Sequence, residues 1–451
     1  MSISSLMGTS RVALSAYQSA IETTARNISN VGNTDYVRRR TDVGALISPT
    51  GGLGFREQDH IDRLESGFIQ RQLWNKNQHL GRHEADELIY SQIESVFNEP
   101  GSSGLSSMMS EFWNSWNDLA NDPESNTARA MVKDKGILLS NTFVRLDSDL
   151  NNMQKEIGYD LEDTVKEINV LMNQIQSINE KVSTNYSYDL ADARDAAISR
   201  LSQLINIDVT ERSDHIVSIS TSGNISVPLV NTSFINELNA TIEAHAKYNT
   251  TNVSFSEGGS ISSITGGKLG SLLEIYNNSI PGYSNEIDAL ATAIGTEVND
   301  VHQLGYNLEN GTGISFFDSE VSGASSLSVS SAIIDDPHLI ATSSNPDESG
   351  NASIASRIAD LQNVNLLRGE KFSDHYNSIV SEVGSKVQES SFLKDSQGIV
   401  IDSLKNRRDS ISGVSLDEEM SNLVKYQQAY QAASRMISVA DELIQSVMAL
   451  I

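Results

Sequence analysis

The segment SGVSLDEEMSNLVKYQQAYQAASRMISVADELIQSVMALI (412–451) carries one uninterrupted amphipathic pattern, with no glycine or proline after Gly413. Apolar and small residues recur at alternating steps of three and four, the spacing of a coiled-coil seam. Ser415 followed by Glu418 forms a capping box, which predicts a helix beginning at Leu416. A helix this long with a narrow apolar stripe requires a partner helix. The C-terminal seam consists of Leu423, Tyr426, Tyr430, Ala433, Ile437, Ala440, Ile444, Val447 and Ile451.

The N-terminus carries a matching pattern that stops abruptly at NISNVGNTDYVRRR (27–40), a stretch rich in turn residues. Because both helices would lie in one terminal layer, we expect them to run antiparallel. Ordinary helix packing within one chain explains the same spacing and stays open at this point. The N-terminal seam consists of Ile3, Met7, Ser10, Leu14, Tyr17, Ile21, Thr24, Ile28 and Val31.

Between the two ends, helical and strand patterns alternate. Apolar residues from Ile157 to Val182 predict a long amphipathic helix, and 269–305 predicts another. Residues 215–230 read as two strands around a turn at 222–224, and 252–265 and 325–334 look similar. The helical pattern returns near Ser353.

These patterns predict a mainly α fold with a β-rich insertion, built as nested layers. We expect a terminal α-helical coiled coil with an extended linker (1–59 and 406–451). A helical middle domain follows (60–205, 266–318 and 346–405), with a small β-rich outer part (206–265 and 319–345).

Composition restricts the function. The formal net charge of −27, from 32 Lys+Arg and 59 Asp+Glu, disfavours nucleic acid and anionic membrane as partners. Arg38, Arg39 and Arg40 are therefore expected to serve the protein's own acidic surfaces. The absence of cysteine excludes thiolate chemistry and disulfides. We find no conventional secretory signal and no membrane span.

No motif predicts a catalytic, metal or cofactor site. His79 and His83 lie four apart on one predicted helix face, but HLGRHE is not HExxH, so a solvated face is the better interpretation. GGKLGS (266–271) lacks the first glycine of a phosphate-binding loop and fits a turn that leads into a helix. We expect no enzyme.

The stretch after the first helix resembles the NISN…T-x-G-Y-S-R signature of flagellar rod, hook and hook-associated proteins. Asp35 replaces the usual glycine and Val37 the usual serine; Asp tolerates left-handed backbone better than most residues. In that family the motif ends the terminal helix and begins an extended segment. The matching residues are Asn27, Ile28, Ser29, Asn30, Val31, Tyr36 and Arg38.

The C-terminal SGVSLDEE…YQQAYQAA pattern narrows the resemblance to the hook-associated protein 1 family, which forms the first hook–filament junction. FWNSWNDLANDPESNTARAMV, DLADARDAAISRLSQLINIDV and GGKLGSLLEIYNNSIPGY are similar to that family in the expected order. The variable outer domain that some members carry after Phe316 looks reduced here.

The resemblance implies a structural protein that is exported unfolded, without a cleaved signal, to an extracellular position on the flagellum. It implies four partners: the hook protein, the second junction protein, an export chaperone and other copies of the chain in a ring. The expected polymer interface is Ile3, Met7, Leu14, Tyr17, Ile21, Ile28, Leu423, Tyr426, Tyr430, Ile437, Ile444, Val447 and Ile451. The expected chaperone contacts are Leu423, Tyr430, Ile437 and Ile444. The alternatives are a flagellin-like or other axial subunit and, less favoured, a muralytic flagellar enzyme.

Overall fold

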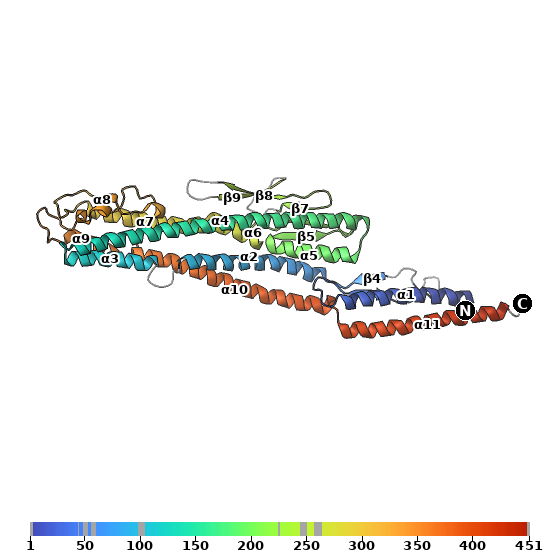
Figure 1. Cartoon of the computed structure of the whole chain (residues 1–451). Coiled ribbons are helices and arrows are strands. Elements are labelled where there is room, and N and C mark those ends of the chain that lie inside the picture. Colours follow the sequence, from blue (N-terminus) through green and yellow to red (C-terminus); the bar gives the residue numbers. More distant parts are fainter. Residues whose placement is uncertain are drawn as a thin grey trace.

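The computed structural model describes residues 3–43, 45–47, 53–55, 60–97, 104–223, 226–243, 250–256 and 264–448. Long helices form an elongated body, and an offset pair of terminal helices extends from one end of it (Figure 1). Small antiparallel sheets lie along the helices. The predicted class, mainly α with a small β insertion, is confirmed.

The terminal layer consists of α1 (Ile3–Ser29) and α11 (Leu416–Met448), which pack along each other. They run antiparallel as predicted, so the N- and C-terminal ends lie at the same tip (Figure 1). The predicted seam residues Ser10 and Thr24 are deeply buried, but between them the deepest burial on α1 falls one position earlier than predicted, on Ala13, Ala16 and Ala20. On α11, Ala433 and Ala440 are buried. Small side chains therefore set a close approach, and the larger seam residues flank it.

The body is built around one very long helix. α4 (Asn126–Thr184) has 59 residues, about 90 Å at ~1.5 Å per residue, and Ser125 caps its first turn. The predicted stripe from Ile157 to Val182 is buried along its whole length. The other main body helices are α2 (Gly67–Phe97), α3 (Leu105–Asn121), α5 (Tyr188–Leu204), α6 (Gly267–Glu274), α7 (Ile280–His302), α9 (Ser353–Asp360) and α10 (Phe372–Ser412).

The helix predicted over 269–305 is confirmed, with an irregular turn in its middle. A π-helical turn at Ile275–Ser279 joins α6 to α7, and Pro281 lies in the first turn of α7. The carbonyl of Tyr276 accepts a hydrogen bond from Gln154 Nε2 at 3.0 Å, so this turn is anchored to α4.

Four small sheets contain the described strands. β1 (Arg39–Asp42) pairs with β4 (His60–Arg63), and β2 (Ala45–Ile47) pairs with β3 (Leu53–Phe55). The predicted extended linker is therefore a β-ribbon, and residues 60–63 belong to it rather than to the helical segment. The predicted hairpin consists of β6 (Val217–Thr221) and β7 (Pro228–Val230), and β5 (Ile207–Glu211) pairs with the other edge of β6. In a separate sheet, β8 (Leu238–Glu243) pairs with β9 (Thr250–Phe255).

Two strand predictions need correction. The 252–265 segment contains only β9, which pairs with the upstream β8, while 257–263 lies outside the described residues. The 325–334 segment is not a hairpin: it contains part of a 3-10 turn, one bridge from Val329 to Phe317, and helix α8 (Ser331–Asp335). Its apolar residues contact α4 and α7 one at a time, and these isolated contacts produce an alternating pattern that resembles a strand.

Asparagine side chains attach the strands and loops to the helices. Asn169 and Asn179 of α4 each donate to and accept from the backbone of one strand residue, Leu238 and Val217 respectively. Asn277 does the same for Thr251 of β9. Each amide thus replaces one residue of a neighbouring strand and satisfies edge groups that would otherwise be unpaired.

Two buried basic side chains hold the loop at 336–342. Arg129 of the ESNTARAMV stretch donates to the carbonyl of Pro123 at 2.7 Å and to Thr342 Oγ1 at 3.1 Å, and burial lowers its pKa to about 10. His302 accepts from the amide of Ala341 at Nε2 (2.9 Å), so Nδ1–H donates to the carbonyl of Ile314 (2.7 Å). Burial lowers the pKa of His302 to about 4, so this histidine is neutral.

The Gly81→Ala variant should be destabilised by about 2–3 kcal/mol, because a methyl group there would lie 2.1 Å from the backbone oxygen of Gln203 in α5. Urea unfolding measures the change. Gly398→Ala in α10 is the matched control, because its methyl group meets open space; it should be neutral or gain up to about 1 kcal/mol. Equal stability of the two variants would contradict the close α2–α5 contact.

Stability should fall as the pH is lowered from about 6.5 toward 4, because the unfolded chain binds a proton that His302 excludes when folded. The contribution is fully present above the unfolded pKa and amounts to roughly 3 kcal/mol. Thermal unfolding of His302→Gln should lose this part of the pH dependence, whereas His215→Gln, at an exposed histidine, should retain it. An unchanged slope in His302→Gln would contradict the assignment.

Candidate functional site

The chain leaves α1 through the loop 30–38, which lies where the terminal layer meets the body. The loop turns on Asn33, whose Oδ1 accepts from the amide of Asp35 at 3.0 Å. Asp35 does not adopt the left-handed conformation, so glycine is not required there and the departure from the signature is tolerated. The next residues enter β1.

Asn27 is the centre of this junction and is only 1% exposed. Its Nδ2 donates to the carbonyl of Arg39 (2.8 Å) and to Glu419 Oε2 (3.0 Å). Its Oδ1 accepts from the hydroxyl of Tyr36 (2.8 Å) and from the amide of Arg39 (3.1 Å). All four hydrogen-bonding positions of the amide are used, and they join α1, the loop, β1 and α11.

Arg38 completes the link to α11. Its guanidinium contacts Glu419 Oε1 at 2.6 Å and Glu418 Oε2 at 2.9 Å. The capping-box pattern assigned Glu418 to Ser415, and its carboxylate instead pairs with this arginine. The amide of Arg38 donates to the carbonyl of Ser412 at the end of α10 (3.0 Å). The Glu419 side chain is 3% exposed, and a buried carboxylate of this kind is stable only when it is paired.

A second ion-pair network joins the β-ribbon to α5. Arg39 contacts Asp189 (2.6 Å) and Asp192 (3.0 Å), while Arg63 contacts Asp192 (2.9 Å) and Asp195 (2.7 Å). Burial raises the pKa of Asp195, and Arg63 opposes that rise. The guanidinium of Arg39 also lies over the rings of Tyr36 and Tyr188, 5.0 and 5.5 Å from their centroids.

The three arginines therefore have separate partners within the chain: Arg38 pairs with α11, Arg39 with α5, and Arg40 lies 3.9 Å from Asp62 of β4. The prediction that they serve the protein's own acidic surfaces is confirmed.

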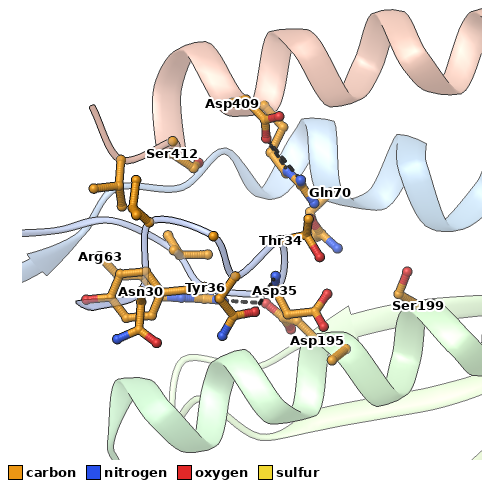
Figure 2. A pocket seen from close by; sticks show the side chains of 18 of the residues that line it. Asn30, Thr34, Asp35, Tyr36, Arg63, Gln70, Asp195, Ser199, Asp409 and Ser412 are labelled. Atoms are coloured by element: carbon orange, nitrogen blue, oxygen red, sulfur yellow. Dashed lines mark hydrogen bonds and ion pairs between the residues drawn. The ribbon is translucent and has the colours of Figure 1, made fainter. Parts of the chain in front are cut away.

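A polar cleft of about 370 Å³ opens beside the junction. Figure 2 shows the loop residues Asn30, Thr34, Asp35 and Tyr36 on one side, Asp195 and Ser199 of α5 below, and Asp409 and Ser412 of α10 above. No histidine or cysteine lines it. Arg63 pairs with Asp195 and Arg408 with Asp409, which leaves Asp35 as the charged lining residue without an ion pair among the described residues. The arrangement positions helices and provides no evident set for catalysis.

The structure brings together Asn27, Tyr36 and Arg38 of the predicted motif; Ser29 and Asn30 make local bonds to the carbonyl of Arg26. The predicted interface residues lie along the α1–α11 pair and are mostly half-buried; Tyr430 is 37% exposed. The half-buried set is Ile3, Met7, Leu14, Tyr17, Ile21, Ile28, Leu423, Tyr426, Ile437 and Ile444. The side chain of Val447 and all of Ile451 lie outside the described residues.

Sequence reasoning missed Glu419 and the Arg63–Asp192 pair. Glu419 had a readable signal: it lies four residues before Leu423, so it occupies a seam position with a charge. The Arg63–Asp192 pair spans more than 120 residues and left no local signal.

His79 and His83 lie on α2, away from the junction. Burial lowers the pKa of His79, and His83 Nδ1 lies 3.6 Å from Asp86. In the described part of the chain, no group of three or more suitable side chains could hold a metal ion. Nor does any helix there have an apolar stretch of the length that a bilayer requires.

The two chain ends pair at one tip (Figure 1) and join the body through the NISN motif, as the resemblance to flagellar axial proteins implies. Residues 90–317, half of the chain, match the family described as "Flagellar hook-associated protein FlgK helical domain", and residues 407–450 match "Flagellar basal body rod FlgEFG protein C-terminal". The chain belongs to the flagellar hook-associated protein FlgK family.

Relatives cover almost the full length. "Flagellar hook-associated protein 1" of Bacillus subtilis is 29% identical over 98% of both chains, and that of Escherichia coli is 24% identical over 97% of this chain and 98% of its own. The solved structure of the flagellar hook junction protein FlgK from Burkholderia pseudomallei has the same fold. It matches with a TM-score of 0.67 at 13% identity and covers 76% of this chain and 100% of its own.

The Asn27→Asp variant should weaken the terminal layer by about 2–3 kcal/mol, because an oxygen would replace the donor that faces Glu419 and the Arg39 carbonyl. Faster amide hydrogen exchange over α1 and α11 would report the loss. Asn30→Ala removes only local hydrogen bonds, to Arg26 and Ser29, and is the control. Adding Glu419→Gln should restore part of the protection, since its amide can donate to the new carboxylate. Normal exchange in Asn27→Asp would contradict the role of Asn27.

Proposed function

We propose that this chain forms a ring at the tip of the flagellar hook, where it joins the hook to the filament and permits filament assembly. It is a structural component of the bacterial flagellum. The observation that carries the ring proposal is the terminal layer: α1 and α11 end at one tip, and their pairing leaves most large seam side chains half-covered. A lattice of neighbouring copies would cover the remainder.

The proposed partners follow from this position: the hook protein below, the second junction protein above, and other copies in the ring. Before assembly, an export chaperone binds the stripe on α11 that includes Leu423, Tyr430, Ile437 and Ile444, as an amphipathic helix in an apolar groove. We propose export to the cell exterior and no enzymatic activity. We also propose that each copy in the ring is divided into a terminal layer, a helical middle domain and a β-rich outer part.

Electron microscopy of a strain lacking this protein tests the junction role. We expect hooks of normal length without filaments, and unassembled flagellin in the medium. Normal filaments on the deletion strain would overturn the proposal. Peptidoglycan digestion by the purified protein would favour the muralytic alternative.

Ile437→Asp should block ring assembly while the body still folds. Ile437 lies between the buried Ala433 and Ala440, where a helix approaches closely. Burial of an isoleucine contributes about 2 kcal/mol, and an unpaired carboxylate costs several more; the penalty recurs in every copy. We expect a secreted, folded monomer and bare hooks, measured by microscopy and by the thermal transition of the purified chain.

Lys425→Asp is the matched control for Ile437→Asp, because Lys425 is exposed on the same helix and lies off the seam. It should leave filaments nearly unaffected. Normal filaments on Ile437→Asp cells would show that the seam is not an assembly surface.

A further inference from the structure

The outward side of α10 carries an unusual apolar pair. Phe392 and Ile399 are each 72% exposed. They lie seven residues apart on one side of the helix, opposite the buried line through Val383, Ser390 and Ile401. Acidic residues flank the pair. We define the α10 face as Glu389, Phe392, Asp395, Ile399 and Asp402, all exposed.

α2 presents a surface of opposite charge. Between Gly67 and His83 it contains no acidic residue. Phe68 is 60% exposed, and Arg71 and Lys76 make no ion pair with any described residue. In a chain with 59 acidic and 32 basic residues, two cations without an ion-pair partner among the described residues, in a stretch of helix that has no acidic residue, are notable. We define the α2 face as Phe68, Arg71, Asn75, Lys76 and His79.

The two faces lie at the same level of the molecule. Ile401 of α10 packs with Ile69 and Leu73 of α2 in a small core of their own, and α5 lies along another side of α2, where Asn77 donates to Ser199 Oγ at 3.2 Å. The α10 face points away from α2. On α2, Phe68, Arg71, Asn75 and His79 point away from the shared core, whereas Lys76, seven residues after Ile69, lies at the edge of that core. One copy therefore cannot bring its own two faces together.

We propose that the α10 face of one copy binds the α2 face of the next copy. The inference rests on the proposed ring. Both faces carry an exposed apolar residue, and their charges are complementary, with Asp395 and Asp402 on one side and Arg71 and Lys76 on the other. A contact between two different faces of identical chains is heterologous, and such contacts generate closed rings when the rotation closes. The contact also offsets repulsion among chains of net charge −27.

The absence of cysteine makes a direct test possible. Gln72→Cys or Asn75→Cys on α2 is combined with Ser396→Cys or Ser403→Cys on α10, and isolated flagella are treated with a short bis-maleimide. Each double variant that brackets the contact should give a ladder of dimers, trimers and larger covalent products on an immunoblot. Each single-cysteine variant should remain monomeric.

A ladder from no pair, dimers from single variants, or an adduct with another flagellar protein would each overturn the inference. Filaments on the same cells show separately whether the ring forms. Normal filaments without cross-linked products would therefore contradict this contact and leave the proposed function supported. Charge reversal gives an independent readout: Arg71→Glu with Lys76→Glu should lose most filaments, as should Asp395→Lys with Asp402→Lys. All four together should recover them, and no recovery would contradict the pairing of the two faces.

Discussion

The amide of Asn27 is the interaction on which the arrangement of layers depends. Its two donors and two acceptors are all engaged, with partners in the loop, β1 and α11. A buried amide with any of these groups unpaired would cost about 1–3 kcal/mol per group. The Asn27 amide therefore holds the end of α1, the start of the ribbon and the first turn of α11 in one geometry. The ion pair between Arg38 and Glu419 lies beside this amide, and the ion pair between Arg39 and Asp189 connects the ribbon to α5.

The same chemistry recurs through the body. Asn169, Asn179 and Asn277 pair with strand backbones as a neighbouring strand would. Short two- and three-stranded sheets are marginal alone, so these amides supply the edge bonds that a larger sheet would provide. An elongated molecule has little deep core in its outer parts. Its abundance of asparagine and its low aromatic content, 6% of residues, fit this mode of attachment.

The helical layers could be predicted because their signal is local and repeated. Each of these signals depends on residues of a single helix: the seam through Ala433 and Ala440, the start of α11, and the stripe along α4. The pairing of β1 with β4 could not be predicted, because both strands have four mostly charged or polar residues and neither shows the apolar alternation of a strand. The 325–334 segment, in contrast, shows the alternation of a strand without forming a hairpin, because its apolar residues contact two helices one at a time. The motif residues were found by resemblance. The charge of Glu419 at a seam position was readable in the sequence, but its partners Asn27 and Arg38 could be identified only when α11 lay beside α1.

The junction at Asn27 holds the terminal layer at a fixed position against the body. Spin labels at Gln18→Cys on α1 and Ala193→Cys on α5, both exposed, measure this in the cysteine-free chain by double electron–electron resonance. With the terminal layer fixed in this way, we expect one narrow distance distribution, as narrow as that of a label pair placed within the body. A broad or multi-peaked distribution in the wild-type background would contradict it, because the terminal layer would then move independently of the body.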